Sequence, residues 1–225
     1  MTFGNRVFTF YKNISLINHL PKDVEVMNPY ATSQVQVYVE QFLKRFFSDN
    51  LKRVFVFGIN PGRFGAGLTG VTFTDPVALE ELCGIKNDLP KKRELSSEFI
   101  YQFIAYWGGI EKFYKDCFLT AVCPLGFVRN GKNYNYYDDP ELFQMLKPFI
   151  IESMNNQLAC GAQREAAILL GSGKNLEVFT ELNREHGFFK KIYAVEHPRF
   201  IMQYRRRVLV DYLKKYHEIF SLALS

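Results

Sequence analysis

Two polar residues, Asn60 and His197, stand just after apolar runs that are typical of buried strands. Asn60 follows Val54–Phe57, and His197 follows Ile192–Val195. Ligands of open α/β sheets bind outside the carboxyl ends of the strands, so both side chains are expected at one edge. An amide can hold a water, and a neutral imidazole can donate to an oxygen that gains negative charge. A turn cap and a satisfied histidine are the plainer interpretations, and for either residue alone they carry at least equal weight.

The loop around Asn60 favours the chemical interpretation. Pro61 fixes the backbone beside the amide, and Gly62 lets the chain pass close to a ligand. Phe73, in Gly70-Val71-Thr72-Phe73, is placed to stack on a planar ligand, although core packing is the default for a chain with 22 Phe residues. The loop therefore predicts one wall of a binding pocket.

Basic residues gather after His197. Arg205-Arg206-Arg207 and Lys214-Lys215 form a patch that suits phosphates, although a solvated helix face is the commoner explanation. The net charge of +5 permits a polyanionic partner without requiring one. Gly171-Ser172-Gly173-Lys174 lacks the earlier glycine and the following Ser or Thr of a phosphate loop, so it predicts only a strand-to-helix turn.

Strand and helix patterns alternate along the chain, which predicts a parallel sheet with helices on both faces. The first thirty residues are expected to be irregular, and Arg129–Asn133 is turn-forming. Strands are expected at 54–57, 117–122, 166–170 and 192–195. Helices are expected at about 33–47, 75–82, 96–107 (capped by Ser96 or Ser97), 140–157, after residue 174, and 200–222.

The length of 225 residues suits one domain, with residues 1–30 as an extension packed on it. The four cysteines form no Cys-x-x-Cys pair, so reduced thiols are expected, with neither metal nor cofactor. No secretion signal is expected, and no apolar run reaches membrane-spanning length. These features predict an intracellular protein.

The motifs resemble a known family. Gly58-Ile59-Asn60-Pro61-Gly62, Phe64-Gly65 and Thr69–Phe73 are similar to the first motif of the single-strand-selective monofunctional uracil-DNA glycosylases. His197-Pro198 resembles the second motif of the uracil-DNA glycosylase superfamily. Asn28-Pro29-Tyr30 and Cys123-Pro124-Leu125 add to a likeness that runs from about residue 26 to 213. The resemblance implies a three-layer α/β/α sandwich around a four-stranded parallel sheet.

The resemblance also implies an activity, the hydrolysis of the N-glycosidic bond of a damaged base in DNA. Asn60 would hold the attacking water, His197 would stabilise the leaving base, and Phe73 would stack on it. No lysine lies in the matched motifs to attack the sugar, which implies a monofunctional enzyme. The implied pocket residues are Ile59, Pro61, Gly62, Phe64, Phe73 and Ala121. The implied wedge and DNA contacts are Arg199, Phe200, Ile201, Met202 and Arg205, with Phe200 or Ile201 as the apolar intercalator.

Two departures from the family pattern bear on the substrate. Ala121 stands where the family has an Asn that reads the pyrimidine edge, so a broader range that includes xanthine is expected. Asn133 and Asn135, in a later loop, are candidates to replace that amide. The second motif continues as Arg199-Phe200-Ile201, which changes the wedge. Asp75 is the nearest carboxylate and a candidate auxiliary base, although a helix N-cap before Pro76 is the more ordinary role.

The resemblance implies a partner, DNA with a damaged base, single- or double-stranded. With it we expect a cytoplasmic monomer, associated with the nucleoid if bacterial. A non-catalytic DNA-damage-binding module on the same fold is the alternative, and Ala121 favours it. A small-molecule or nucleotide-binding α/β protein is a third hypothesis, which depends only on Gly171–Lys174.

Overall fold

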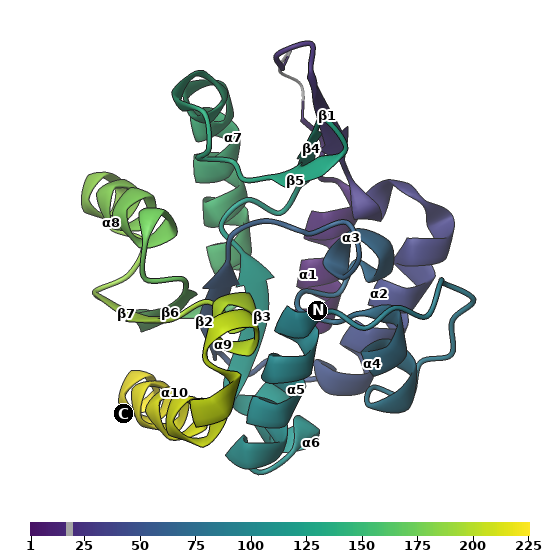
Figure 1. Cartoon of the computed structure of the whole chain (residues 1–225), viewed down its shortest axis with the longest axis vertical. Helices are drawn as coiled ribbons and strands as arrows, with labels where there is room; N and C mark the ends of the chain where they lie inside the picture. Colours follow the sequence, from purple (N-terminus) through teal and green to yellow (C-terminus); the bar gives the residue numbers. More distant parts are fainter. Residues whose placement is uncertain (17–19) are drawn as a thin grey trace.

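Four parallel strands form the centre of the molecule, in the order β3-β2-β6-β7 (Figure 1). The computed structural model describes residues 1–16 and 20–225. The strands are β2 (Arg53–Gly58), β3 (Cys117–Ala121), β6 (Ala162–Leu170) and β7 (Lys191–Val195). The predicted four-stranded parallel sheet is confirmed, and β6 begins four residues before its expected start.

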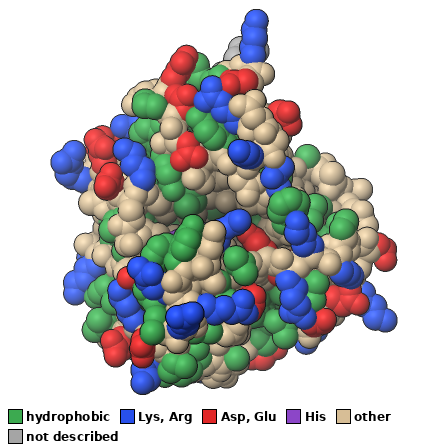
Figure 2. Space-filling model, in the orientation of Figure 1, with side chains coloured by type: hydrophobic (Ala, Val, Ile, Leu, Met, Phe, Trp, Pro, Cys, Tyr) green, Lys and Arg blue, Asp and Glu red, His purple; other side chains and the backbone are tan. Residues whose placement is uncertain are grey.

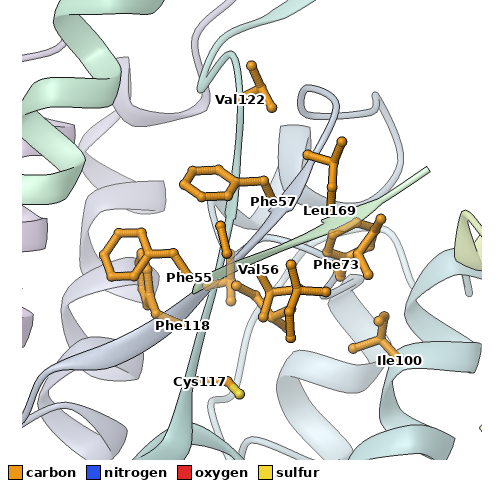
Figure 3. Packing of buried hydrophobic residues seen from close by; sticks show 14 of the residues in the cluster. Phe55, Val56, Phe57, Phe73, Ile100, Cys117, Phe118, Val122 and Leu169 are labelled. Atoms are coloured by element: carbon orange, nitrogen blue, oxygen red, sulfur yellow. The ribbon is translucent and has the colours of Figure 1, made fainter. Parts of the chain in front are cut away.

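The two inner strands of the sheet, β2 from Val54 onward and β6 from Ala166 onward, are apolar because helices cover both of their faces. Every residue of β2 is buried. Side chains alternate between faces along a strand, so Phe55 and Phe57 point to the face opposite Val54 and Val56. Figure 3 shows Phe55 beside Phe118, with ring centroids 5.1 Å apart. Core residues therefore pack against both faces of β2.

The helices form a layer on each face of the sheet (Figure 1). Right-handed crossovers put α5 (Leu95–Trp107) on one face, and α7 (Pro140–Ala159) and α8 (Lys174–His186) on the other. The last helix, α10 (Leu209–Leu224), joins α5, while α1 (Phe3–Lys12) joins α7. The three-layer α/β/α architecture is confirmed. The other helical segments that precede β3 are η1 (Pro29–Ala31), α2 (Ser33–Phe46), α3 (Ala66–Thr69), α4 (Pro76–Glu81) and α6 (Ile110–Asp116).

A small antiparallel sheet lies near the carboxyl ends of the main strands. It contains β1 (Val24–Met27), β4 (Gly126–Arg129) and β5 (Lys132–Tyr134) in the order β1-β4-β5. The expected turn at 129–133 is confirmed, since Asn130 and Gly131 both have positive φ, as a tight hairpin turn requires. The sequence analysis did not predict β4 and β5, on either side of this turn, because each is only three or four residues long.

The expectation of an irregular N-terminus is wrong. Phe3, Val7 and Tyr11 form the buried stripe of α1, and the Phe3 ring packs on Phe47 and Phe118. Of the predicted 1–30 extension, residues 17–19 lie outside the described residues.

The C-terminal helix is divided, contrary to the expected single helix over 200–222. It forms α9 (Pro198–Tyr204), a short turn η2 (Arg206–Val208), and α10. The backbone leaves helical geometry at Arg205, with φ −129° and ψ 16°. The break lets α9 start at the edge of the sheet while α10 packs along β6 and β7. Among the described residues, no helix is both long and apolar enough to cross a membrane.

Candidate active site

A pocket opens at the carboxyl ends of the central strands, with a volume of about 290 Å³. Figure 2 shows a hollow near the middle of this face, with Lys and Arg side chains gathered below it. The pocket is lined by Asn60 from the loop after β2, His197 from the end of β7, and Phe73. The structure thus brings together the three residues that the sequence analysis singled out. The other lining residues are Gly58, Ile59, Pro61, Gly62, Ala66, Thr72, Glu94, Ser96, Ala121, Asn133, Asn135 and Arg199.

The amide of Asn60 is oriented by backbone atoms of the segment that follows β5. Its Nδ2 donates to the carbonyl oxygen of Tyr134 at 3.3 Å, and its Oδ1 accepts from the N–H of Tyr136 at 3.3 Å. Asn60 does not cap a helix, since α3 begins only at Ala66 with Gly65 as its N-cap. Each polar atom of the amide keeps one further hydrogen-bonding position, which is what holding a water requires.

The ring of His197 is held in a defined orientation at the start of α9. Its Nδ1 accepts from the backbone N–H of Arg199 at 3.2 Å, which makes His197 the N-cap of that helix. Burial, with a smaller contribution from the charge of Arg199, lowers the pKa of His197 to about 4. The ring is therefore neutral at pH 7, and its single proton is on Nε2.

Phe73 closes the pocket on the side of β2. Its ring centroid lies 6.0 Å from that of His197. The residue is buried and has a φ of 56°, a left-handed conformation that a bulky side chain rarely takes. A Cβ at Gly58 would lie 2.7 Å from Cζ of Phe73, so the glycine makes room for the ring. Phe73 thus belongs to the core and also lines the pocket.

Ala121 lies at the end of β3, in register with Gly58 of β2. It lines the pocket with a methyl group, and it is 5% exposed. Besides Asn60, the amide side chains that line the pocket belong to Asn133 and Asn135. Asn133 lies at the rim, where its Oδ1 accepts from the backbone N–H and from Nε of Arg63, both at 3.2 Å. Asn135 donates from its Nδ2 to Asp138.

Some implied site residues lie elsewhere. The ring of Phe64 is outside the pocket, 40% exposed, with Nζ of Lys92 3.9 Å from its centroid. Ile201 and Met202 are buried in the core, so of the two proposed intercalators only Phe200 reaches solvent. Phe200 packs on Tyr204 and lies under the guanidinium of Arg205, while Arg199 lines the pocket.

Asp75 is placed as a helix cap outside the pocket lining. Its Oδ1 accepts from the N–H groups of Val77 and Ala78, each at 2.9 Å, and its Oδ2 accepts from the N–H of Glu94 at 2.9 Å. The backbone N–H of Asp75 donates to Ser97 Oγ. The predicted serine cap of α5 is therefore wrong: Glu94 precedes the helix, and the Ser97 hydroxyl serves Asp75 instead.

Glu94 is a pocket carboxylate that the sequence analysis missed. Its side chain lines the pocket beside Gly62 and Gly65. Burial raises the pKa of this carboxyl, and the positive charge of Arg199 opposes the rise. No motif surrounds Glu94, and it reaches the pocket only because α4 and its cap turn the chain back, so no signal in the sequence marks it.

Comparison with known proteins agrees with this geometry. Residues 45–221 match the family model of the uracil DNA glycosylase superfamily. The structure is similar to the crystal structure of wild-type Pedobacter heparinus SMUG2, with a TM-score of 0.96 and 42% sequence identity. That match covers 99% of this chain and 98% of the other. The family model and the extent of the likeness agree with the motifs around Asn60 and His197: the chain belongs to the uracil-DNA glycosylase superfamily.

Proposed function

We propose that this protein is a monofunctional DNA glycosylase that removes deaminated bases, namely uracil, xanthine and 5-hydroxymethyluracil, in base-excision repair. The observation that carries the proposal is the meeting of Asn60, His197 and Phe73 in one pocket at the carboxyl edge of the sheet. Membership of the superfamily supports the same reaction class.

The reaction needs a base outside the helix stack. A target base leaves the duplex at a cost of a few kcal/mol and enters the pocket, where the Phe73 ring gives it a stacking surface. Arg199, at the pocket, and the exposed Phe200 are placed to contact the strand and to fill the gap that the base leaves. Basic side chains beside the hollow suit the phosphates (Figure 2).

Asn60 and His197 together would promote cleavage of the N-glycosidic bond. As the N-glycosidic bond breaks, the sugar gains oxocarbenium character and the base departs with the bonding electrons. The Nε2–H of His197 donates to the base oxygen that becomes negative, which is worth about 3 kcal/mol for one well-placed donor. A water on Asn60 adds its oxygen to C1′ and loses a proton, which the departing base anion takes up through solvent. The products are the free base and an abasic site.

The pocket also supports a hydrolytic route that leaves the strand intact. The described residues that line it include no lysine whose amine would attack C1′. A glycosylase of this kind leaves an abasic site, which only later treatment with alkali cleaves.

A panel of oligonucleotides tests the proposal, each with one deaminated base and each treated with alkali after incubation. Release of uracil, with loss of release in Asn60→Ala at an unchanged melting temperature, is the expected result. Failure to release uracil, xanthine or 5-hydroxymethyluracil from either single- or double-stranded DNA would overturn it.

Ala121 favours one other function, a non-catalytic module that binds damaged DNA. The methyl group makes no hydrogen bond to a base edge, so recognition by this strand end is weaker than an amide would provide. Binding to uracil-containing or abasic DNA without any base release would select this alternative.

A further inference from the structure

Two polar atoms face the space beside Gly62, and the reaction described above uses neither. A Cβ built at Gly62 would lie 3.4 Å from Nδ2 of Asn133 and 3.7 Å from Oε1 of Glu94. The missing side chain at Gly62 thus leaves room between an amide donor and a carboxylate acceptor. All three residues line the pocket that holds Asn60 and His197.

The hydrogen bonds of Asn133 determine which end of its amide faces this space. Its Oδ1 accepts two hydrogen bonds from Arg63. An arginine offers only donors, so the oxygen must point to Arg63 and the NH₂ group must point away from it. Asn133 therefore presents a donor on this wall of the pocket.

Glu94 presents the acceptor. Its backbone N–H is held by Asp75, which positions the start of α5 against the glycine loop. Within the part of the chain that the structure describes, burial and the charges of Arg199 and Asp75 act on this carboxylate, and no hydrogen bond to either of its oxygens does. A half-buried carboxylate that accepts no hydrogen bond needs a donor, and the flipped base is a group that can bring one.

We propose that Glu94 and Asn133 read the lactam edge of the flipped base, in place of the amide that Ala121 lacks. Uracil, hypoxanthine and xanthine all present a ring N–H beside a carbonyl oxygen. The N–H donates to Glu94, and the carbonyl accepts from Asn133. Cytosine and adenine present a bare ring nitrogen beside an amino group, so both contacts would fail and leave polar groups unpaired.

The inference rests on the proposed function and names the substrate class of the same site. Contacts with Glu94 and Asn133 would distinguish uracil from cytosine, and hypoxanthine from adenine. We also expect that one pocket accepts pyrimidines and purines, because the lactam edge is common to both. Thymine and guanine carry the same edge, so the pair does not discriminate against them.

Binding to uncleavable DNA tests this pair separately from catalysis. The probes are single-stranded oligonucleotides with one 2′-fluoro-deoxyuridine or one 2′-fluoro-deoxycytidine, whose glycosidic bonds resist hydrolysis. We expect the wild-type protein to bind the uracil probe more tightly than the cytosine probe. Asn133→Asp replaces the donor by an acceptor and Glu94→Gln removes the charge. Each should lower the ratio of the two affinities by about 10-fold or more, and the double variant should reverse the preference.

Asn130→Asp is the matched control. It makes the same chemical change in the same hairpin, at an exposed turn residue whose positive φ suits Asp. Glu165→Gln removes one carboxylate charge from an ion pair with Lys190, outside the pocket lining. Both should bind the probes with the wild-type ratio. Melting temperatures of all variants show whether each is folded.

Gly62→Ala provides a second route if a charged variant does not fold. Its methyl group fits without overlap, 3.4 Å from the nearest atom, yet it lies between the donor and the acceptor. It should lower the same affinity ratio. If these variants fold and their affinity ratios are unchanged, the inference about Glu94 and Asn133 is overturned. The glycosylase proposal would still stand in that case, provided that the wild-type protein releases uracil. Absence of any base release by the wild-type protein would instead overturn the proposed function.

Discussion

Nδ1 of His197 accepts a hydrogen bond from the backbone N–H of Arg199, and this contact joins the capping of α9 to the chemistry of the pocket. It leaves the ring proton on Nε2, the atom that donates to the departing base in the proposed mechanism. A second proton would have to go on Nδ1, where it would face the N–H of Arg199 and break the cap. The helix cap therefore requires the neutral state of His197, which is also the state that the proposed mechanism uses.

This relationship predicts how stability depends on pH. The pKa of His197 is lowered to about 4 from its ordinary value of 6.5, so the unfolded chain binds this proton at a higher pH than the folded protein does. The contribution is fully present above about pH 6.5 and is lost as the pH falls towards 4. It amounts to up to about 3 kcal/mol.

His197→Asn tests this dependence by urea unfolding between pH 4.5 and 7. Asparagine keeps the cap but does not titrate, so the stability of the variant should fall less steeply on acidification. His217→Asn, at an exposed position on α10, should keep the wild-type slope. Equal slopes for wild type and His197→Asn would contradict the assignment. Base release by His197→Asn should fall by about 100-fold or more, because the shorter amide does not reach the base oxygen.

Gly58→Ala should displace the ring of Phe73. The new Cβ would lie 2.7 Å from Cζ and 2.9 Å from Cε2 of that ring. A Cβ is fixed to the backbone, so it cannot rotate away from this overlap. Overpacking of this kind costs about 1–3 kcal/mol. We expect a lower free energy of unfolding and a loss of base release together. Gly62→Ala is the control for stability alone, since its nearest atom is 3.4 Å away. A Gly58→Ala protein as stable as wild type would show that Phe73 is not held by this contact.

Asp75→Ala separates a capping role from that of an auxiliary base. The cap holds three backbone N–H groups, of Val77, Ala78 and Glu94, so its loss should cost about 1–2 kcal/mol. Single-turnover rates over a range of pH provide the second measurement. A capping residue leaves the shape of the pH–rate profile unchanged, whereas loss of a general base removes its acidic limb. A wild-type melting temperature combined with abolished base release would favour the auxiliary-base role.

Phe200→Ala should act on duplex substrates selectively. The side chain is 39% exposed at the start of α9, close to the pocket residue Arg199, while its neighbour Ile201 is buried. An apolar wedge offsets the cost of unstacking, which single-stranded DNA hardly incurs. Base release from double-stranded DNA should fall by roughly 10-fold, with little change on single strands. Val208→Ala, another exposed apolar residue, should leave both rates unchanged. Equal losses on the two substrates would assign the wedge to another residue.

The sequence was informative where a signal is local. The apolar run before Gly58 predicts β2 because a strand buried on both faces has few polar residues, and the carboxyl-edge rule then places Asn60 and His197 together. The tight turn at Asn130-Gly131 and the cap at Asp75 before Pro76 depend on neighbouring residues, and the structure has both. The family motif carried the same information about Asn60, Phe73 and His197.

Tertiary structure decided what depends on contacts between distant segments. Glu94 reaches the pocket because Asp75 holds its backbone, and Asn133 because β5 pairs with β4 beside the glycine loop. The division of the C-terminal helix at Arg205 follows from the packing of α10 on β6 and β7, to which no local pattern points. The sequence by itself thus determined that Asn60 and His197, the proposed reacting pair, meet at one pocket, since strand ends and motifs are local. Only the folded chain determined what surrounds that pair, because burial, orientation and the pKa of His197 depend on residues far apart in the sequence.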